Sequence, residues 1–163
     1  MNYVFDAYFL IYFGKLRILD YLTSIKGNKY IPKDVYREVR SNRVGDEEVD
    51  YIESIISKGM ITIKEPKKII EPGHNLSLAD REVISLAMET NSIAVVDERQ
   101  ANYVAQAYSV KTHGSIYILL ELVRLGAITK KTAISYIDKI VASGFFLSSL
   151  AYKAILDTID RMR

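Results

Sequence analysis

The chain contains no cysteine and only two histidines. The absence of cysteine excludes disulfide bonds, thiolate catalysis and cysteine-ligated zinc. His74 and His113 are far apart in the sequence, and neither has a second histidine at metal-ligand spacing. The sequence therefore argues against a zinc site and against acid–base catalysis by histidine. No glycine-rich loop follows the first predicted strand and no Gly-Lys-Ser/Thr motif occurs, which argues against a nucleotide-binding or phosphotransfer domain.

Long apolar runs and a strong net charge are also missing. No stretch reaches the roughly 18 apolar residues of a membrane-spanning helix. The apolar segment 1–13 has no Lys or Arg before it and is interrupted by Asp6, so it does not have the pattern of a signal peptide. We therefore expect a soluble, cytoplasmic protein. The net charge of +2 is too small to indicate nucleic-acid binding, which must come from local patches.

The 163 residues alternate between strand and helix patterns. Short β-branched or apolar runs predict strands over 3–5, 29–31, 61–63, 93–96 and 110–112. Apolar residues at helical spacing predict helices over 9–25, 32–39, 47–57, 77–89 and 98–108, then over 115–125, 130–142 and from 148 onward. Residues 64–75 read as a loop long enough to serve a function. We expect one domain over 1–163, a three-layer α/β/α sandwich with a short, mostly parallel sheet and a helical C-terminal tail.

Four acidic residues stand at the points where this pattern changes. Asp6 and Asp97 each follow a predicted strand, Asp80 lies in the first turn of a predicted helix, and Glu38 lies on the helix that follows Pro32. In open α/β sheets, ligands bind at the carboxyl edge of the strands. Carboxylates gathered there are hard oxygen ligands that suit Mg²⁺ or Mn²⁺.

Each of these acids also has an interpretation without a metal. Asp6 can cap the helix that follows it, and Glu38 can lie on a solvated helix face. Two pairs have the spacing of capping motifs, namely Asp97 with Gln100 and Ser77 with Asp80.

Taken together, the acids favour a metal site. Aspartates that end neighbouring parallel strands lie within a few ångströms of each other. At a separation of about 4 Å and an effective dielectric of about 20, two such charges repel by roughly 4 kcal/mol. Either a divalent cation lies among them or some of the carboxylates are protonated. The first explanation accounts for all four acids at once.

The order of these segments resembles that of PIN-domain ribonucleases, the fold of the VapC-type toxins. The resemblance is to a compact prokaryotic subgroup of PIN-like proteins and covers almost the whole chain. Its motifs are the strand that ends at Asp6, Tyr30-Ile-Pro-Lys-Asp-Val-Tyr-Arg-Glu38, Leu76-Ser-Leu-Ala-Asp80, Val95-Val-Asp97-Glu-Arg and Thr112-His-Gly-Ser. The resemblance implies that Asp6, Glu38, Asp80 and Asp97 bind one or two Mg²⁺ or Mn²⁺ ions. It also implies hydrolysis of phosphodiester bonds in RNA.

Three positions depart from the pattern of this family. Tyr8 replaces a small hydroxyl residue two places after the first aspartate, Glu98 replaces a second aspartate after the fourth acid, and Asn102 replaces an arginine. Tyr8 and Asn102 affect the expected substrate contacts more than the metal site. Glu98 can still ligate a metal through its longer side chain.

Within this expected centre the residues receive different roles. Asp6 and Asp97 are expected to bind the metal directly because strand ends fix them. Asp80 and Glu38 are expected to bind directly or through water. Ser115 is expected either to support Asp97 by a hydrogen bond or to cap its own helix. Glu98 is expected in the first turn of its helix, behind the metal ligands.

An RNA strand also needs cations along its path. The candidates are the arginines close to the acids in sequence: Arg81, Arg99, Arg37, Arg40 and Arg43. Each is also a plausible solvated surface charge. Tyr8 and Tyr36 are candidates for stacking on bases, with burial in the core as the alternative.

The expected partners are RNA, a second copy of the chain and a small antitoxin protein. The homodimer follows from the resemblance and from apolar residues that exceed the apparent needs of the core: Leu10, Phe13, Ile137, Ile140, Phe145 and Phe146. The alternative function is a PIN-fold binding or assembly module with little or no nuclease turnover.

Overall fold

The computed structural model describes residues 1–41, 45–71, 73 and 75–163. Arg43 and His74, considered above, lie outside the described residues. The chain forms two compact units, which comprise residues 1–115 and 116–163.

The first unit contains one sheet of five parallel strands in the order β3-β2-β1-β4-β5. The strands are β1 (Asn2–Phe5), β2 (Lys29–Ile31), β3 (Thr62–Ile63), β4 (Ser92–Val95) and β5 (Thr112–His113). β1 lies at the centre and pairs with β4 so that Phe5 is opposite Val95. Because the strands are parallel, the residues that follow β1 and β4 meet at the same edge of the sheet.

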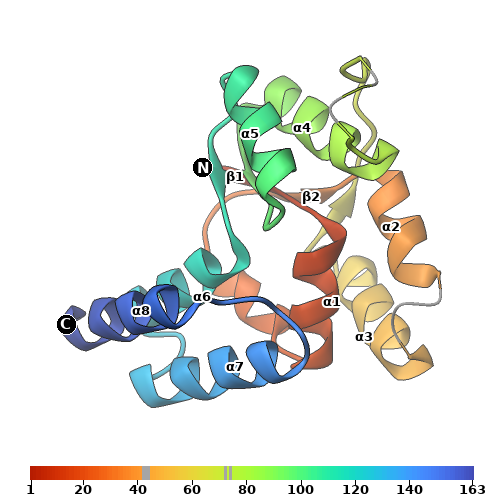
Figure 1. The fold of residues 1–163 in the computed structure, drawn as a ribbon. Coiled ribbons are helices and arrows are strands. Elements are labelled where there is room, and N and C mark those ends of the chain that lie inside the picture. Colours follow the sequence, from red (N-terminus) through yellow and green to blue (C-terminus); the bar gives the residue numbers. More distant parts are fainter. Residues whose placement is uncertain (42–44, 72, 74) are drawn as a thin grey trace. The chain divides into compact units, whose positions relative to one another are not determined.

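Helices cover both faces of this sheet. They are α1 (Ala7–Lys15), the 3₁₀ helix η1 (Leu19–Ser24), α2 (Lys33–Arg40), α3 (Asp46–Ser57), α4 (Leu78–Thr90) and α5 (Arg99–Ala107). Figure 1 shows α4 and α5 on one face and α1 and α3 on the other. Right-handed crossovers produce this arrangement when the chain builds strands first on one side of β1 and then on the other. The predicted α/β/α architecture is confirmed, and the sheet is wholly parallel.

A column of stacked phenylalanine rings connects β1 to α1. The ring centroids of Phe5 and Phe9 are 4.1 Å apart, and those of Phe9 and Phe13 are 4.2 Å apart. All three side chains are at most 1% exposed. This buried column fixes α1 against the sheet directly after Asp6.

The predicted helix over 9–25 is wrong, because two shorter helices replace it. α1 ends at Lys15, and Arg17 takes a left-handed conformation with φ of 54°. The backbone N–H of Arg17 donates to the carbonyl of Gly14, and the N–H of Ile18 donates to that of Phe13. Buried Ile18 and Leu19 then start η1. Burial of these side chains offsets the cost of about 1–2 kcal/mol for a left-handed residue other than glycine.

The second unit is helical. It contains α7 (Lys130–Ala142), α8 (Ser149–Arg161) and nearly all of α6 (Ser115–Arg124), which begins at the last residue of the first unit. The Tyr152 hydroxyl donates to Asp138 Oδ1 at 2.6 Å, and Lys130 Nζ donates to the carbonyl of Asp160 at 2.9 Å. These bonds join α7 to α8. None of the described helices has the length and apolar character needed to cross a membrane.

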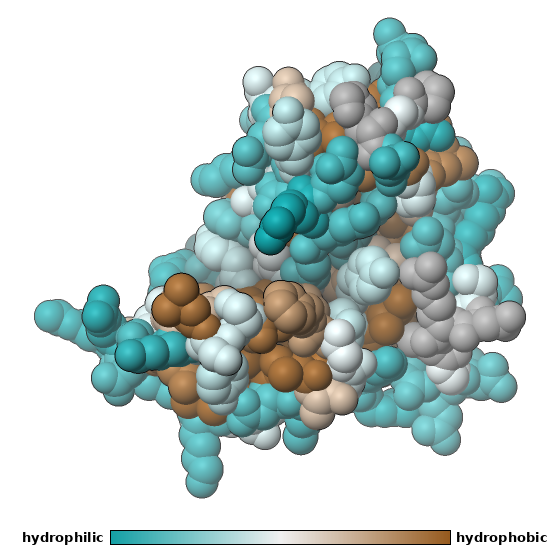
Figure 2. Space-filling model, in the orientation of Figure 1, coloured by the Kyte–Doolittle hydropathy of each residue, from teal (hydrophilic) through white to brown (hydrophobic). Residues whose placement is uncertain are grey.

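The apolar residues that suggested a dimer divide into two groups. Leu10, Phe13, Ile137 and Ile140 are at most 1% exposed, so the chain itself buries them and they give no argument for a dimer. Phe145 is half-buried, whereas Phe146 is 86% exposed and Leu150 is 79% exposed. Figure 2 shows apolar side chains gathered over α7 and α8 on the face that it draws.

Candidate functional site

Asp6 and Asp97 meet at the carboxyl edge of the sheet. Asp6 caps α1, because its Oδ1 accepts the N–H of Phe9 at 2.9 Å. Its Oδ2 accepts the backbone N–H of Asp97 at 3.3 Å. The capping interpretation of Asp6 is therefore confirmed, and the same carboxylate also contacts the residue that follows β4. Asp6 is only 2% exposed.

Asp97 is oriented by the start of α6. Its Oδ1 accepts the backbone N–H of Ser115 at 2.8 Å, and its Oδ2 accepts the Ser115 hydroxyl. A Cβ atom at Gly114 would lie 3.0 Å from Asp97 Oδ1, so glycine allows this close approach. The predicted hydrogen bond between Ser115 and Asp97 is confirmed. The predicted capping pair of Asp97 with Gln100 is wrong, since Asp97 lies before the N-cap residue of α5 and turns to α6 instead.

Asp80 and Glu98 form a second pair of acids. Ser77 caps α4 by accepting the Asp80 N–H at 3.1 Å, which confirms the predicted cap and leaves the Asp80 carboxylate free to point elsewhere. A hydrogen bond joins the side chains of Asp80 and Glu98. Glu98 is the N-cap residue of α5, one position before the first turn where it was expected. A hydrogen bond between two carboxyl groups requires a proton on one of them.

Glu38 lies beside the start of α4. It lines a hollow of ≈ 350 Å³ together with Leu78 and Ala79, the two residues before Asp80. A buried acid that the sequence analysis missed helps to place its helix. Glu82 Oε2 accepts the N–H of Asp34 in the first turn of α2 at 3.2 Å, and Asp34 lies one helical turn before Glu38. The only sequence signal for Glu82 is an acid directly before the apolar run 83–84.

The carboxylates near the edge of the sheet have raised pKa values. Burial is the largest cause for Asp6, and the negative charge of Asp97 adds to it, so the pKa of Asp6 lies well above its ordinary value. The charge of Asp80 also reaches Asp6. Burial raises the pKa of Asp97, while the two hydrogen bonds from Ser115 lower it. Burial, the charge of Asp80 and the hydrogen bond with it raise the pKa of Glu98.

This donor set fits a divalent cation in its chemistry. It consists of hard carboxylate oxygens, and at least Asp6 is buried where a second negative charge opposes its ionisation. A cation would relieve that repulsion and also the repulsion between Asp80 and Glu98. Among the described residues, however, no three of these acids are arranged as a formed metal site. The structure brings Asp6 to Asp97 and Asp80 to Glu98, and it places Glu38 beside the start of α4.

Of the five arginines expected to contact RNA, four lie in the described residues, and three of these have partners within the chain. Arg37 pairs with Asp34 at 2.7 Å. Arg40 lies 3.5 Å from Glu53 and over the ring of Tyr36. Arg81 donates from Nη1 to the carbonyl of Ile70 at 3.3 Å, and its buried Nε has no hydrogen-bond partner among the described atoms. Arg99 is exposed in the first turn of α5, next to Glu98.

The tyrosines expected to stack on bases have different surroundings. Tyr36 is half-buried, and its hydroxyl donates to Glu53 Oε1 at 2.8 Å. Tyr8 is 43% exposed and is therefore not a core residue.

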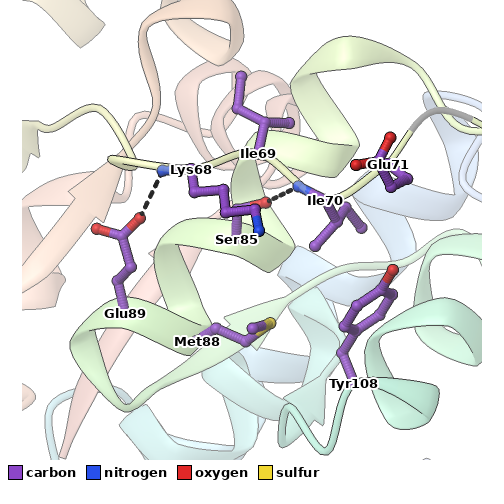
Figure 3. A pocket seen from close by; sticks show the side chains of 8 residues that line it. All are labelled: Lys68, Ile69, Ile70, Glu71, Ser85, Met88, Glu89 and Tyr108. Atoms are coloured by element: carbon purple, nitrogen blue, oxygen red, sulfur yellow. Dashed lines mark hydrogen bonds between the residues drawn. The ribbon is translucent and has the colours of Figure 1, made fainter.

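A separate hollow lies along the C-terminal half of α4. Its volume is ≈ 240 Å³, and Figure 3 shows Met88 and Tyr108 lining it opposite the segment 68–71. That segment is attached to α4, because Ser85 Oγ accepts the N–H of Ile70 at 2.9 Å and Glu89 accepts the N–H groups of residues 67 and 68. The hollow is not part of the acidic centre, because its lining does not include Asp6, Glu38, Asp80, Asp97 or Glu98.

Comparison with known proteins agrees with the fold. A protein-family model described as a PIN domain matches residues 2–161. No curated protein matches the chain.

Proposed function

The chain belongs to the PIN-domain family, and we propose that it is a metal-dependent endoribonuclease that hydrolyses phosphodiester bonds in RNA. PIN domains are generally nucleases and typically use divalent metals. The observation that carries the proposal is the contact between Asp6 and Asp97, two acids held by neighbouring strands at the edge of the sheet. Burial of Asp6 makes that contact costly without a cation.

The residues of the centre would divide the work of catalysis. A bound Mg²⁺ or Mn²⁺ supplies Lewis acidity and lowers the pKa of a water ligand. Asp6 and Asp97 would hold the ion directly, since backbone and Ser115 hydrogen bonds fix their carboxylates. Asp80 and Glu38 would ligate directly or through water, and one of them would orient the attacking water. Glu98 would support Asp80, to which it is hydrogen-bonded.

The proposed RNA contacts come from residues around this centre. Arg99 is exposed beside Glu98 and is the strongest of the arginine candidates. Arg37 and Arg40 could exchange their acidic partners for phosphate, because both arginine side chains are exposed and ion pairs at the surface are worth only about 0–1 kcal/mol. Arg81 is the weakest candidate, because it is directed to the segment before α4.

Cleavage of RNA by the purified protein tests the proposal. Assorted RNAs are incubated with the protein and Mn²⁺, and the products are separated on gels. We expect cleavage that a chelator abolishes and that Asp6→Asn or Asp97→Asn reduces more than about 100-fold, since even residues behind a metal ligand typically matter 10–100-fold. Asp50→Asn, an exposed acid on α3, is the matched control and should leave the rate unchanged. Cleavage that survives both the chelator and the substitutions would remove this mechanism.

A binding or assembly module with little turnover is the second candidate function. The observation that favours this function is that, among the described residues, no three acids are arranged so that they could bind a metal ion together. The same assay separates the two, because a binding module would retain RNA in a gel-shift experiment without cutting it.

The proposed biological setting is a toxin–antitoxin pair. In it the chain acts as a homodimer in the cytoplasm, where RNA is available, and a small antitoxin protein restrains it. A short reading frame next to the gene, whose product binds the chain and inhibits cleavage, would support this setting.

A further inference from the structure

A strip of two tyrosines and a lysine runs along α1. Tyr8, Tyr12 and Lys15 are spaced by four and three residues and therefore lie on the same side of the helix. The ring centroids of Tyr8 and Tyr12 are 6.4 Å apart, with only 19° between the ring planes. The ammonium group of Lys15 lies 6.0 Å from the centroid of Tyr12.

The protein core does not account for this strip. Packing of α1 on the sheet is provided by Phe5, Phe9 and Phe13, whose stacked rings are buried. Tyr8 is 43% exposed and Lys15 is exposed. The helix thus carries a buried row of phenylalanines and, on another side, a row in which Tyr8 and Lys15 are exposed and Tyr12 is half-buried.

The strip begins at the acidic centre. Asp6 caps α1, and Tyr8 is in the first turn of that helix. One turn further along, burial, the neighbouring Tyr8 and the negative charge of Asp97 all raise the pKa of Tyr12, so Tyr12 lies within electrostatic reach of Asp97. Lys15 follows at the end of the helix. A nucleic acid strand with a phosphate at the acids would have its neighbouring base and next phosphate near this row.

We propose that Tyr8 and Tyr12 form a stacking platform for one unpaired base beside the scissile phosphate, and that Lys15 contacts the following phosphate. This rests on the proposed nuclease function and names the side chains that contact the RNA next to the cleaved bond. Exposed aromatic rings bind unpaired bases irrespective of sequence, because every base has a π-face. In a duplex the bases are already stacked on each other and cannot reach such a platform.

Binding without turnover tests the platform. A fluorescein-labelled single-stranded oligoribonucleotide is titrated with the full chain in the presence of a chelator, and its anisotropy is measured. We expect Tyr8→Ala and Tyr12→Ala each to weaken binding by roughly 5- to 150-fold, the range measured for loss of one stacked base. Tyr8→Phe should bind within about twofold of the wild type, because stacking needs the ring and not the hydroxyl.

The control is Tyr103→Ala, which removes a 66% exposed tyrosine from α5 and should leave binding unchanged. A set of oligonucleotides, each with one abasic position, identifies the stacked base. One of the abasic oligonucleotides should bind the wild type only as tightly as the intact strand binds Tyr8→Ala. The affinity for this abasic oligonucleotide should be the same in the wild type and in Tyr8→Ala. If Tyr12→Ala does not fold, the two Tyr8 variants decide the question alone.

The platform is wrong if Tyr8→Ala binds like the wild type, if the loss is equal at every abasic position, or if duplex RNA binds as tightly as the single strand. These outcomes are separable from a failure of the proposed function. Cleavage that depends on Mn²⁺ with no loss of binding in Tyr8→Ala overturns the platform alone. Loss of binding in Tyr8→Ala without cleavage of any RNA supports the platform and overturns the nuclease.

Discussion

One carboxylate, that of Asp6, joins three parts of the first unit. One oxygen caps α1 and the other accepts the amide that follows β4, while Phe5 beside it packs into the core. Both oxygens thus have donors, yet burial and the charge of Asp97 still hold the pKa of Asp6 well above its ordinary value of 3.8. Two amide hydrogen bonds do not compensate for burial beside another acid.

The stability of the metal-free protein should therefore depend on pH. The pKa of Asp6 is higher in the folded state than in the unfolded state. Its stabilising contribution to the free energy of unfolding is therefore fully present below about pH 3.8 and is lost as pH rises through the folded pKa. We expect the melting temperature in chelator to fall as the pH rises above about 3.8 toward neutrality, and to fall less in Asp6→Asn, which cannot ionise. Asparagine is also a good N-cap, so α1 keeps its start.

Calorimetry at several pH values measures this difference, with Asp50→Asn as the control that should keep the wild-type slope. Mn²⁺ should restore the stability of the wild type at neutral pH and have little effect on Asp6→Asn. Equal slopes for the wild type and Asp6→Asn would show that burial of this carboxylate has no energetic consequence.

The positions of Asp6 and Asp97 could be predicted because each directly ends a strand, and parallel strands bring their ends together. Other parts of the centre depend on side-chain directions that local sequence does not determine. Examples are the bond between Glu98 and Asp80 and the attachment of α2 by Glu82. Arg81 follows Asp80 in sequence but turns toward Ile70, since successive helix residues point about 100° apart.

At the scale of elements, the sequence predicted every strand and most helix limits to within two residues. The exception was the end of α1 at residues 15–18. Apolar residues continue at helical spacing from Leu10 through Leu22, and no proline or glycine marks the turn at Arg17. Periodicity alone could not detect this turn, because the same apolar residues are buried by two shorter helices. Gly14 lies inside α1 and does not end the helix. Its lack of a side chain allows Ile52 of α3 to pack closely against α1.

A double-mutant cycle tests this contact between α1 and α3. A Cβ at Gly14 would lie 2.9 Å from Cδ1 of Ile52, whose side chain is 0% exposed. Gly14→Ala should gain about 1 kcal/mol of helix propensity and lose about 1–3 kcal/mol by overpacking, so we expect a net loss of stability. Ile52→Val removes Cδ1 but keeps Cγ1, which would lie 3.2 Å from the added Cβ, so in that background Gly14→Ala should cost less stability.

Urea unfolding of the four proteins gives the coupling free energy, which should be about 0.5–3 kcal/mol for residues in contact. The same free-energy change for Gly14→Ala in both backgrounds would contradict the role of Gly14 in helix packing.

At the scale of the molecule, the second unit carries the most exposed apolar side chains. Phe146 and Leu150 lie at and after the turn between α7 and α8. Figure 2 shows apolar side chains gathered over these two helices. The proposed homodimer therefore depends on Phe146 and Leu150, because the isoleucines of α7 are buried within the chain. The sequence could not distinguish the two groups, because both have helical spacing and only the packing of α7 and α8 decides which residues are buried.

If the chain is a homodimer, substitution of Phe146 and Leu150 should reduce the mass of the particle in solution to that of a monomer. Sedimentation at micromolar concentration should show a dimer for the wild type and a monomer for Phe146→Asp combined with Leu150→Asp, because a charge there would be buried without a partner. Lys153→Asp, at an exposed position of α8, should remain dimeric. A wild-type monomer at high micromolar concentration would rule out the dimer.

The central position of β1 has a consequence for synthesis of the chain. The backbone N–H that donates to Asp6 belongs to a residue that is synthesised 91 positions later. β1 cannot obtain its second neighbour before β4 has been translated, and pairing over such a sequence distance is slow. The acidic edge of the sheet, and with it the proposed nuclease centre, therefore cannot form before β4 has been made.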